Sequence, residues 1–321
     1  MKKIIMISLI AIIAIIGNSS KMITGELNLE KFEKIRVDLG IADLEIIGSN
    51  NNKLFYSYED NDKIEYDYYV SNNKFNLIES KRAQFFNFYT PKNEFIINTY
   101  YDQEYMDIKG ATSDITIKNI YSYKTDIDTS TGDIEIYDSN GEYIKIKTST
   151  GDQELYETTY KEIELKSSTG DIEIERTNSE IIDLESSTGE QEISNTKTKK
   201  LYTKTTTGDQ EIENTQADIM NLRTSIGEIT VKNSNTNKLK INATTGSIYI
   251  NLNNNPETIE LSTTIGEIMI NNLDLNQYKI RINTSIGDIK TPYGNFEKQF
   301  EYGNGQKTIE IRTTTGDIIL K

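Results

Sequence analysis

A series of acidic side chains, each directly after a glycine of a repeated motif, is the part of this sequence best suited to binding a cation. Ca²⁺ takes about six to eight oxygen ligands, several of them from one site. One carboxylate per repeat offers few ligands per ion, so the pattern favours a structural turn, with weak surface calcium binding as the alternative and no cofactor predicted. The acids are Asp133, Asp152, Asp171, Glu190, Asp209, Glu228, Glu267, Asp288 and Asp317.

Catalytic chemistry has little support in the composition. The chain contains no histidine and no cysteine, which removes the commonest general base, thiol nucleophiles and thiolate metal sites. A pair of carboxylates could still hydrolyse a glycosidic bond, but nothing singles out such a pair. The sequence therefore predicts no enzyme and no catalytic, cofactor-binding or metal-binding residue, and a polysaccharide-acting β-helix enzyme is the least favoured alternative.

Aromatic residues suggest a different kind of site. Residues 48–105 hold about half of the aromatic side chains, and Phe85, Phe86, Phe88 and Tyr89 lie almost consecutively. Rigid aromatic side chains often dominate binding surfaces, so these four are the candidate partner-binding residues. The other interpretation, which the sequence favours, is an aromatic cap over the open edge of a repeat array.

A repeat of the type STGDIEI positions all these residues. Its first glycines are separated by 19 residues each time, and the later gaps are 20, 21 and 29 residues. Self-similarity at such a period indicates a solenoid. The glycines are Gly132, Gly151, Gly170, Gly189, Gly208, Gly227, Gly246, Gly266, Gly287 and Gly316.

Within each repeat, apolar residues lie seven and five positions before the glycine and two and four positions after it, as at Ile163, Leu165, Ile172 and Ile174. This alternation predicts two short strands joined by a turn. The strands can bury their apolar side chains by stacking in parallel on the next coil. We therefore expect an all-β protein, a parallel β-solenoid (β-helix) of about eleven coils, with right-handed winding.

Gln153, Gln191 and Gln210 break the apolar rule at a position that points inward. Buried amides need hydrogen-bond partners. Since Gln191 and Gln210 lie in adjacent coils, we expect them to bond to each other.

The chain divides into three parts. Residues 1–20 have the charge and apolar run of a signal peptide, or of a short membrane anchor. Residues 24–112 contain a degenerate first coil, with Ala42 in the glycine position, and an aromatic β insertion in which Asn72 and Asn73 form a hairpin turn. Residues 113–321 form the solenoid, with a capping insertion at 292–306 that we expect to cover the last coil.

Charge and the N-terminal segment constrain location and partners. The net charge of −15 disfavours binding to nucleic acid or anionic lipid. A membrane partner is predicted only if the N-terminal segment stays uncleaved. The predicted location is exported: extracellular, at the cell surface or in the periplasm.

The STGDIEI-type repeats, the opening IRVDLGIADLEIIGS and the final TTTGDIILK resemble the bacterial putative-adhesin family, a β-strand-repeat domain of unknown function. The resemblance covers residues from about 30 to 321 and implies a parallel β-solenoid on exported or membrane-associated proteins. It leads to the hypothesis of a non-enzymatic, adhesin-like surface or envelope protein that binds a protein or glycan partner. The alternative is a structural or regulatory cell-envelope protein.

Overall fold

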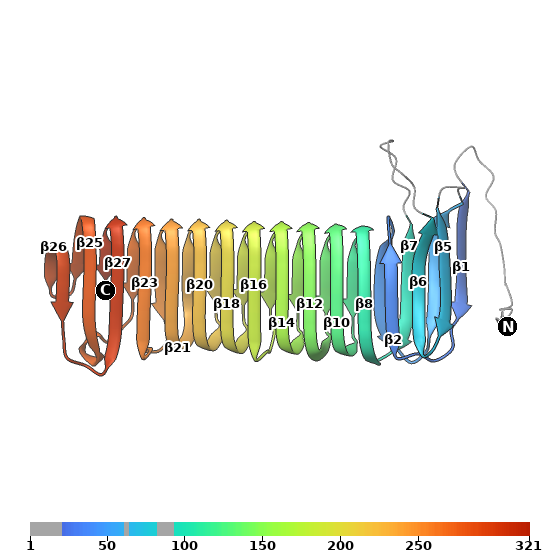
Figure 1. Ribbon diagram of the computed structural model, residues 1–321. Helices are drawn as coiled ribbons and strands as arrows, with labels where there is room; N and C mark the ends of the chain where they lie inside the picture. Colours follow the sequence, from blue (N-terminus) through green and yellow to red (C-terminus); the bar gives the residue numbers. More distant parts are fainter. Residues whose placement is uncertain (1–20, 61–63, 82–92) are drawn as a thin grey trace.

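The computed structural model describes residues 21–60, 64–81 and 93–321. These residues form a rod of stacked coils with the N-terminal strands at one end (Figure 1). The predicted signal peptide at 1–20 and the candidate residues Phe85, Phe86, Phe88 and Tyr89 lie outside the described residues.

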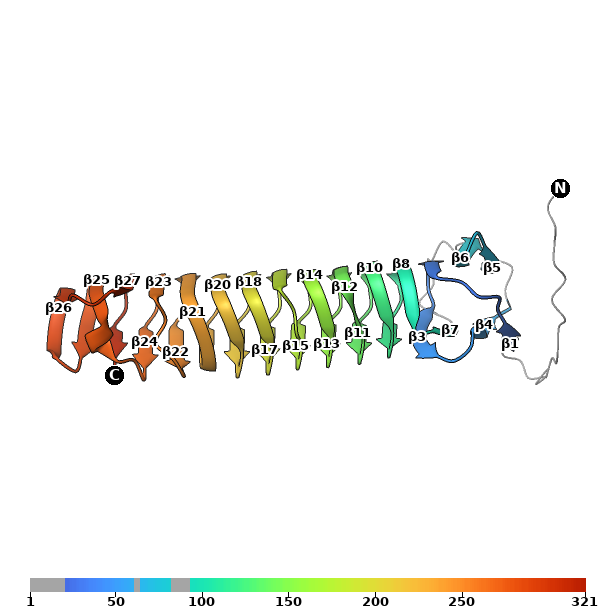
Figure 2. The same ribbon diagram turned by 90° about the horizontal axis from the view of Figure 1, so that it is seen from below.

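Each coil of the rod contributes a long strand to one sheet and a short strand to the opposite sheet (Figure 2). The long strands are β8 (Asp102–Thr112), β10 (Tyr121–Thr131), β12 (Asn140–Thr150), β14 (Thr159–Thr169), β16 (Ile181–Thr188), β18 (Lys197–Thr207), β20 (Gln216–Ile226) and β23 (Thr258–Ile265). The short strands are β9 (Ile115–Lys118), β11 (Ile134–Tyr137), β13 (Gln153–Tyr156), β15 (Ile172–Glu175), β17 (Gln191–Ser194), β19 (Gln210–Glu213), β22 (Ile248–Leu252) and β24 (Ile268–Asn271). β21 (Ile229–Thr245) is continuous and serves both sheets.

Parallel pairing in register stacks equivalent residues of successive coils. Ile144 pairs with Ile163 and Ile163 with Ile182, and all three are buried. The predicted alternation and parallel β-solenoid are therefore confirmed. About nine turns keep a period close to 19 residues; the sequence-based count of about eleven coils included end coils, where hairpins interrupt the period.

The repeat glycines form one corner of the rod. At Gly170 φ is +138°, which L-residues rarely adopt. A Cβ at Gly170 would also overlap the carbonyl oxygen of Gly151 in the preceding coil. Glycine is thus required both by its own backbone conformation and by the close approach of the neighbouring coil.

A second corner follows most of the short strands and is built from residues other than glycine. Its residues adopt the left-handed conformation, with φ between 47° and 64°. Asparagine tolerates this conformation best among these side chains, and it occupies most of the positions. The column comprises Asn119, Asp138, Glu157, Arg176, Asn195, Asn214, Asn233 and Asn272.

At the N-terminal end, the degenerate coil stacks on the array as predicted. Its strands β2 (Lys34–Leu39) and β3 (Asp43–Ser49) pair in parallel with β8 and β9. On their other side β2 pairs with β6 and β3 with β7, so the insertion covers the open edge of the first coil. The insertion comprises β4 (Lys53–Glu59), β5 (Glu65–Ser71), β6 (Lys74–Lys81) and β7 (Glu94–Tyr100), and β1 (Met22–Asn28) pairs with β4.

The N-terminal end has two groups of paired strands, one of β2, β6 and β5 and the other of β3, β7, β4 and β1. Aromatic rings pack between these two groups. Tyr66 from β5 contacts Phe95 from β7 edge-on, with ring centroids 4.8 Å apart. Tyr56 stacks on Tyr68 at 5.4 Å. The hairpin between β5 and β6 turns at Asn72 and Asn73, both with positive φ, as predicted.

At the C-terminal end the coils are stacked out of chain order. The strands there are β25 (Tyr278–Thr291), β26 (Gly294–Tyr302), β27 (Lys307–Thr315) and β28 (Ile318–Leu320), preceded by the 3₁₀ helix η1 (Leu275–Gln277). β27 lies between β23 and β25 and pairs in parallel with both. β26 pairs antiparallel with β25. The insertion 292–306 therefore covers the coil of β25, which is the outermost coil. We expected it to cover the last coil of the sequence, and this prediction was wrong, because the last coil, which contains β27, lies one position further inside the rod. No helix in the described part of the chain has the length and apolar character needed to cross a membrane.

Candidate functional site

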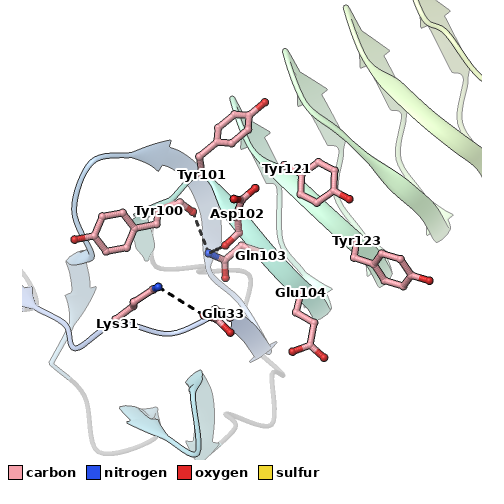
Figure 3. A pocket seen from close by; sticks show the side chains of 9 residues that line it. All are labelled: Lys31, Glu33, Tyr100, Tyr101, Asp102, Gln103, Glu104, Tyr121 and Tyr123. Carbon is pink, nitrogen blue, oxygen red and sulfur yellow. Dashed lines mark hydrogen bonds and ion pairs between the residues drawn. The ribbon is translucent and has the colours of Figure 1, made fainter.

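A depression lined by tyrosines lies where the N-terminal end meets the regular coils (Figure 3). Its volume is about 840 Å³, within the usual range for ligand sites. Three of its rings remain well exposed: Tyr100 (42%), Tyr101 (42%) and Tyr123 (51%). The lining residues are Lys31, Glu33, Tyr100, Tyr101, Asp102, Gln103, Glu104, Tyr121 and Tyr123.

Three segments far apart in the sequence meet at this depression. Lys31 and Glu33 precede β2, Tyr100 and Tyr101 form the turn from β7 into β8, and Tyr121 and Tyr123 begin β10. Parallel pairing of β8 with β10 sets Tyr121 beside Asp102. The stacking of the first coils therefore brings the tyrosines together.

Hydrogen bonds and ring contacts hold two of these tyrosines in place. The hydroxyl of Tyr101 accepts a hydrogen bond from Asn140 Nδ2 at 2.7 Å. The ring of Tyr123 meets Tyr143 edge-on at 5.9 Å. Side chains fixed before binding lose less conformational freedom when a ligand arrives.

Gln103 forms the polar floor of the depression. Its Nε2 donates to Thr99 Oγ1 at 3.0 Å, to Tyr100 O at 3.0 Å and to Asp102 O at 2.9 Å. Its Oε1 is buried without a hydrogen-bond partner. The side chain thus fixes the backbone that carries Tyr100 and Asp102.

Charged groups surround the aromatic rings. Lys31 forms an ion pair with Glu33 at 3.6 Å, and Glu104 pairs with Lys34 at 3.1 Å. The site offers exposed aromatic faces together with carboxylate oxygens as hydrogen-bond acceptors. This combination suits binding of a polar ligand.

Neighbouring Tyr105 on β8 is held by the same stacking. Burial, followed by the hydrogen bond to Asp126, raises the pKa of Tyr105 to about 12. Its hydroxyl therefore stays protonated at neutral pH and donates to Asp126 Oδ2 at 2.9 Å.

This depression was not predicted from the sequence. Its members come from separate segments, and only the coil register shows that they meet. The pair Tyr100–Tyr101 and the alternation of Tyr121 with Tyr123 were the available signals.

The acids after the repeat glycines contribute to the turns, as the sequence favoured. The carboxylate of Asp152 accepts a hydrogen bond from the backbone N–H of Asp171 at 2.8 Å, and Asp133 accepts from Asp152 at 2.9 Å. The same bond recurs between other adjacent coils, including Glu190 N–H to Asp171 at 2.7 Å. Among the described residues, no group of three or more acidic side chains is arranged to hold a metal ion.

A second column of acids, distinct from the acids after the glycines and not predicted from the sequence, follows the outer face of the short strands. Register pairs Glu135 with Glu154, Glu154 with Glu173, Glu173 with Glu192, and Glu192 with Glu211. Burial first, then repulsion from Glu192 and Glu154, raises the pKa of Glu173. This face is therefore strongly acidic.

The inward glutamines form the predicted hydrogen bond. Gln210 Nε2 donates to Gln191 Oε1 at 3.0 Å and to Arg223 O at 2.9 Å. Thr203 donates to Gln210 Oε1 at 2.9 Å. Gln153 lies in a separate coil and donates to Thr148 Oγ1 and Lys166 O, each at 2.8 Å. Gln191 and Gln210 therefore form a local polar patch inside the solenoid, and Ile172 separates Gln153 from it.

Several solved structures are similar to this chain at low identity. One is described as a putative lipid binding protein from Parabacteroides distasonis ATCC 8503, with 15% identity and a TM-score of 0.46 over 95% of this chain and 98% of that one. A putative adhesin from Parabacteroides merdae ATCC 43184 has 12% identity and a TM-score of 0.47 over 95% and 98%. A putative adhesin from Bacteroides fragilis NCTC 9343 has 16% identity and a TM-score of 0.36 over 94% and 98%.

A search of curated proteins finds no match. The family model described as Toastrack DUF4097 matches residues 32–155, 102–180 and 155–321. These matches together span most of the chain and confirm the resemblance carried by the STGDIEI repeats. The chain belongs to the Toastrack DUF4097 family.

Proposed function

We propose that this protein is an exported, non-enzymatic, adhesin-like surface protein that binds a glycan in the tyrosine-lined depression. The observation that carries the proposal is the exposure of Tyr100, Tyr101 and Tyr123 around one depression. Large aromatic rings serving only the core are normally buried, as Phe95 is.

The chemistry of the depression favours a carbohydrate ligand. Tyrosine faces pack against the C–H faces of sugar rings, while carboxylates such as Asp102 accept hydrogen bonds from sugar hydroxyls. The net charge of −15 disfavours polyanionic glycans. The expected ligand is therefore a neutral or amino-sugar oligosaccharide.

Binding to a glycan array, followed by titration of the best ligand, tests the proposal. Replacing Tyr101 and Tyr123 together by alanine removes two aromatic contacts and should weaken binding by about tenfold or more. Tyr69→Ala is the matched control, because Tyr69 is 47% exposed but lies on β5, away from the depression. Equal affinity in the double variant and the wild type would contradict the proposal.

The second candidate is a structural or regulatory protein of the cell envelope. The acidic column from Glu135 to Glu211 favours it, because a repetitive acidic face suits a repetitive basic partner. Capture of an envelope component that is unaffected by the Tyr101/Tyr123 variant, together with an empty glycan array, would support this candidate.

A further inference from the structure

The C-terminal segment, residues 307–321, is inserted between two coils that precede it in the sequence. Figure 1 shows β27 between β23 and β25. The glycine corner repeats the same order: Gly266 N–H donates to Thr315 O at 3.0 Å, and Gly316 N–H donates to Ile286 O at 2.8 Å. The coil that contains Gly266 thus bonds to the inserted segment, and the inserted segment bonds to the coil that contains Ile286.

The inserted segment makes strand contacts on both sides. Ile309 pairs with Ile259 of β23 and with Ile280 of β25, and Ile311 pairs with Leu261 and Ile282. Ile309, Ile311 and Ile318 are fully buried. Residues 307–321 therefore complete two strand interfaces and a section of the core.

β25 carries the same inward pattern as β27. In register, Ile280 matches Ile309, Ile282 matches Ile311, and Thr284 matches Thr313. Either strand therefore presents compatible side chains to β23. The pattern alone would therefore allow β25 to stack directly on β23, as successive coils do elsewhere. The space between β23 and β25, which we call the slot, exists because residues 307–321 fill it.

The connection to the inserted segment contains a glycine-rich hinge. Residues 303–306 read Gly-Asn-Gly-Gln and join β26 to β27 without regular structure. Gly303 has a φ of +78°, where glycine is unstrained. A short connection of this kind can reorient an intact terminal element, which is the route by which copies exchange identical segments.

We propose that the slot between β23 and β25 is a strand-binding site that accepts residues 307–321 from a second copy of this chain as well as from its own. The second copy is the occupant that the structure supports, because its segment has the same register with both walls. The product is a dimer joined by exchanged C-terminal segments.

The natural lack of cysteine allows a direct cross-linking test on the full chain. Glu260 on β23 faces outward beside Glu310 on β27. Neighbouring strands lie about 4.8 Å apart, within the Cα separation of about 4.4–6.8 Å that a disulfide spans. Both side chains are 46% exposed and their ion pairs lie at the surface, where such pairs contribute little.

Chains with the single substitution Glu260→Cys are unfolded, mixed with Glu310→Cys chains and refolded together under oxidising conditions. Exchange predicts a disulfide-linked heterodimer whose yield rises with protein concentration. The control pair is Asp183→Cys with Tyr202→Cys, neighbours on β16 and β18 in the regular array. We expect about tenfold more heterodimer from the first pair, because exchange is confined to the terminal segment. Equal yields would overturn the proposal.

Double variants of one chain test the stacking order on which the proposal rests. Glu260→Cys with Glu310→Cys should form an intramolecular disulfide in the monomer. Glu260→Cys with Arg281→Cys should not, because β27 separates Glu260 from Arg281. The reverse result would show that β25 stacks on β23 and that the slot does not exist.

Discussion

The middle of the molecule and its two ends are built from the same coil but obey different rules. From β8 to β23 each coil stacks on the one before it, in chain order and in register. At both ends the chain travels outward and then returns inward. β8 returns to the side of β2 opposite the insertion, and β27 returns between β23 and β25.

This difference separates the residues that fix the shape from those that could recognise a partner. In the middle, glycine, threonine and aspartate recur because each coil needs the same corner, and carboxylates such as that of Asp152 are bonded to the backbone of the next coil. At the ends the period fails, and unrepeated residues come together. The tyrosine-lined depression and the exchangeable segment both lie there.

The largest expected effect comes from adding one methyl group at a repeat glycine. Gly170→Ala introduces a Cβ that overlaps the Gly151 carbonyl at a φ of +138°, so we expect a loss of about 3 kcal/mol or more in unfolding free energy. Gly294 at the C-terminal end has a similar φ of +131°, but a Cβ there meets only the Phe296 ring at 3.7 Å. Gly294→Ala should cost about 1 kcal/mol.

Urea unfolding of the two glycine variants provides the measurement. A midpoint that falls much further for Gly170→Ala than for Gly294→Ala supports the distinction between middle and end. Equal losses would mean that backbone strain alone, and not the contact between coils, sets the requirement for glycine.

A smaller effect on stability is expected at the second corner, where a few positions hold a residue other than the usual asparagine. Glu157 has a φ of +53° in a column where Asn195 has +50°. Glu157→Asn should raise stability by about 0.5–1 kcal/mol, because asparagine tolerates the left-handed conformation better. The ion pair that Glu157 makes with Arg176 at 3.3 Å is exposed and offsets little of this gain.

Asn195→Glu is the reverse substitution and should lower stability by a similar amount. Thermal denaturation followed by circular dichroism measures both variants. Shifts of the same sign in the two variants would contradict the assignment of this corner to left-handed strain.

The repetitive part of the fold was predictable from sequence because each coil repeats the same inward apolar positions and the same glycine turn. The positions of Gly170, the hairpin at Asn72 and Asn73, and the bond between Gln191 and Gln210 all follow from local pattern and period. The order of the C-terminal coils did not follow, because β25 and β27 carry the same inward residues and the pattern cannot distinguish them. The depression was missed because Lys31, Tyr101 and Tyr123 meet only through stacking.

The smallest expected effect on stability comes from replacing single glutamates, one on the short strands and one on the long strands. On the short strands, burial and the neighbouring Glu192 and Glu154 raise the pKa of Glu173. On the long strands, the hydrogen bond from Lys204 at 2.6 Å lowers the pKa of Glu185. Glu173→Gln should therefore raise stability at neutral pH and Glu185→Gln should lower it, each by about 0.5 kcal/mol.

The two glutamates should also differ in pH dependence. Because the folded pKa of Glu173 lies above its ordinary value of 4.5, its contribution to stability falls as pH rises from 4.5 through the raised value. Because the folded pKa of Glu185 lies below 4.5, its contribution is present above 4.5 and is lost as pH falls through the lowered value. Melting temperatures from pH 3 to pH 7 test this, and effects of equal sign at pH 7 would contradict it.

The decisive measurement is amide hydrogen exchange of the wild-type protein with and without the oligosaccharide identified on the array. It asks whether the ligand binds in the tyrosine-lined depression, at the junction of the N-terminal end with the regular coils, or along the repetitive middle of the rod. Slower exchange confined to residues 31–33, 100–104 and 121–123 is the predicted result. Slower exchange along residues 133–213, with no change at the junction, would contradict the account.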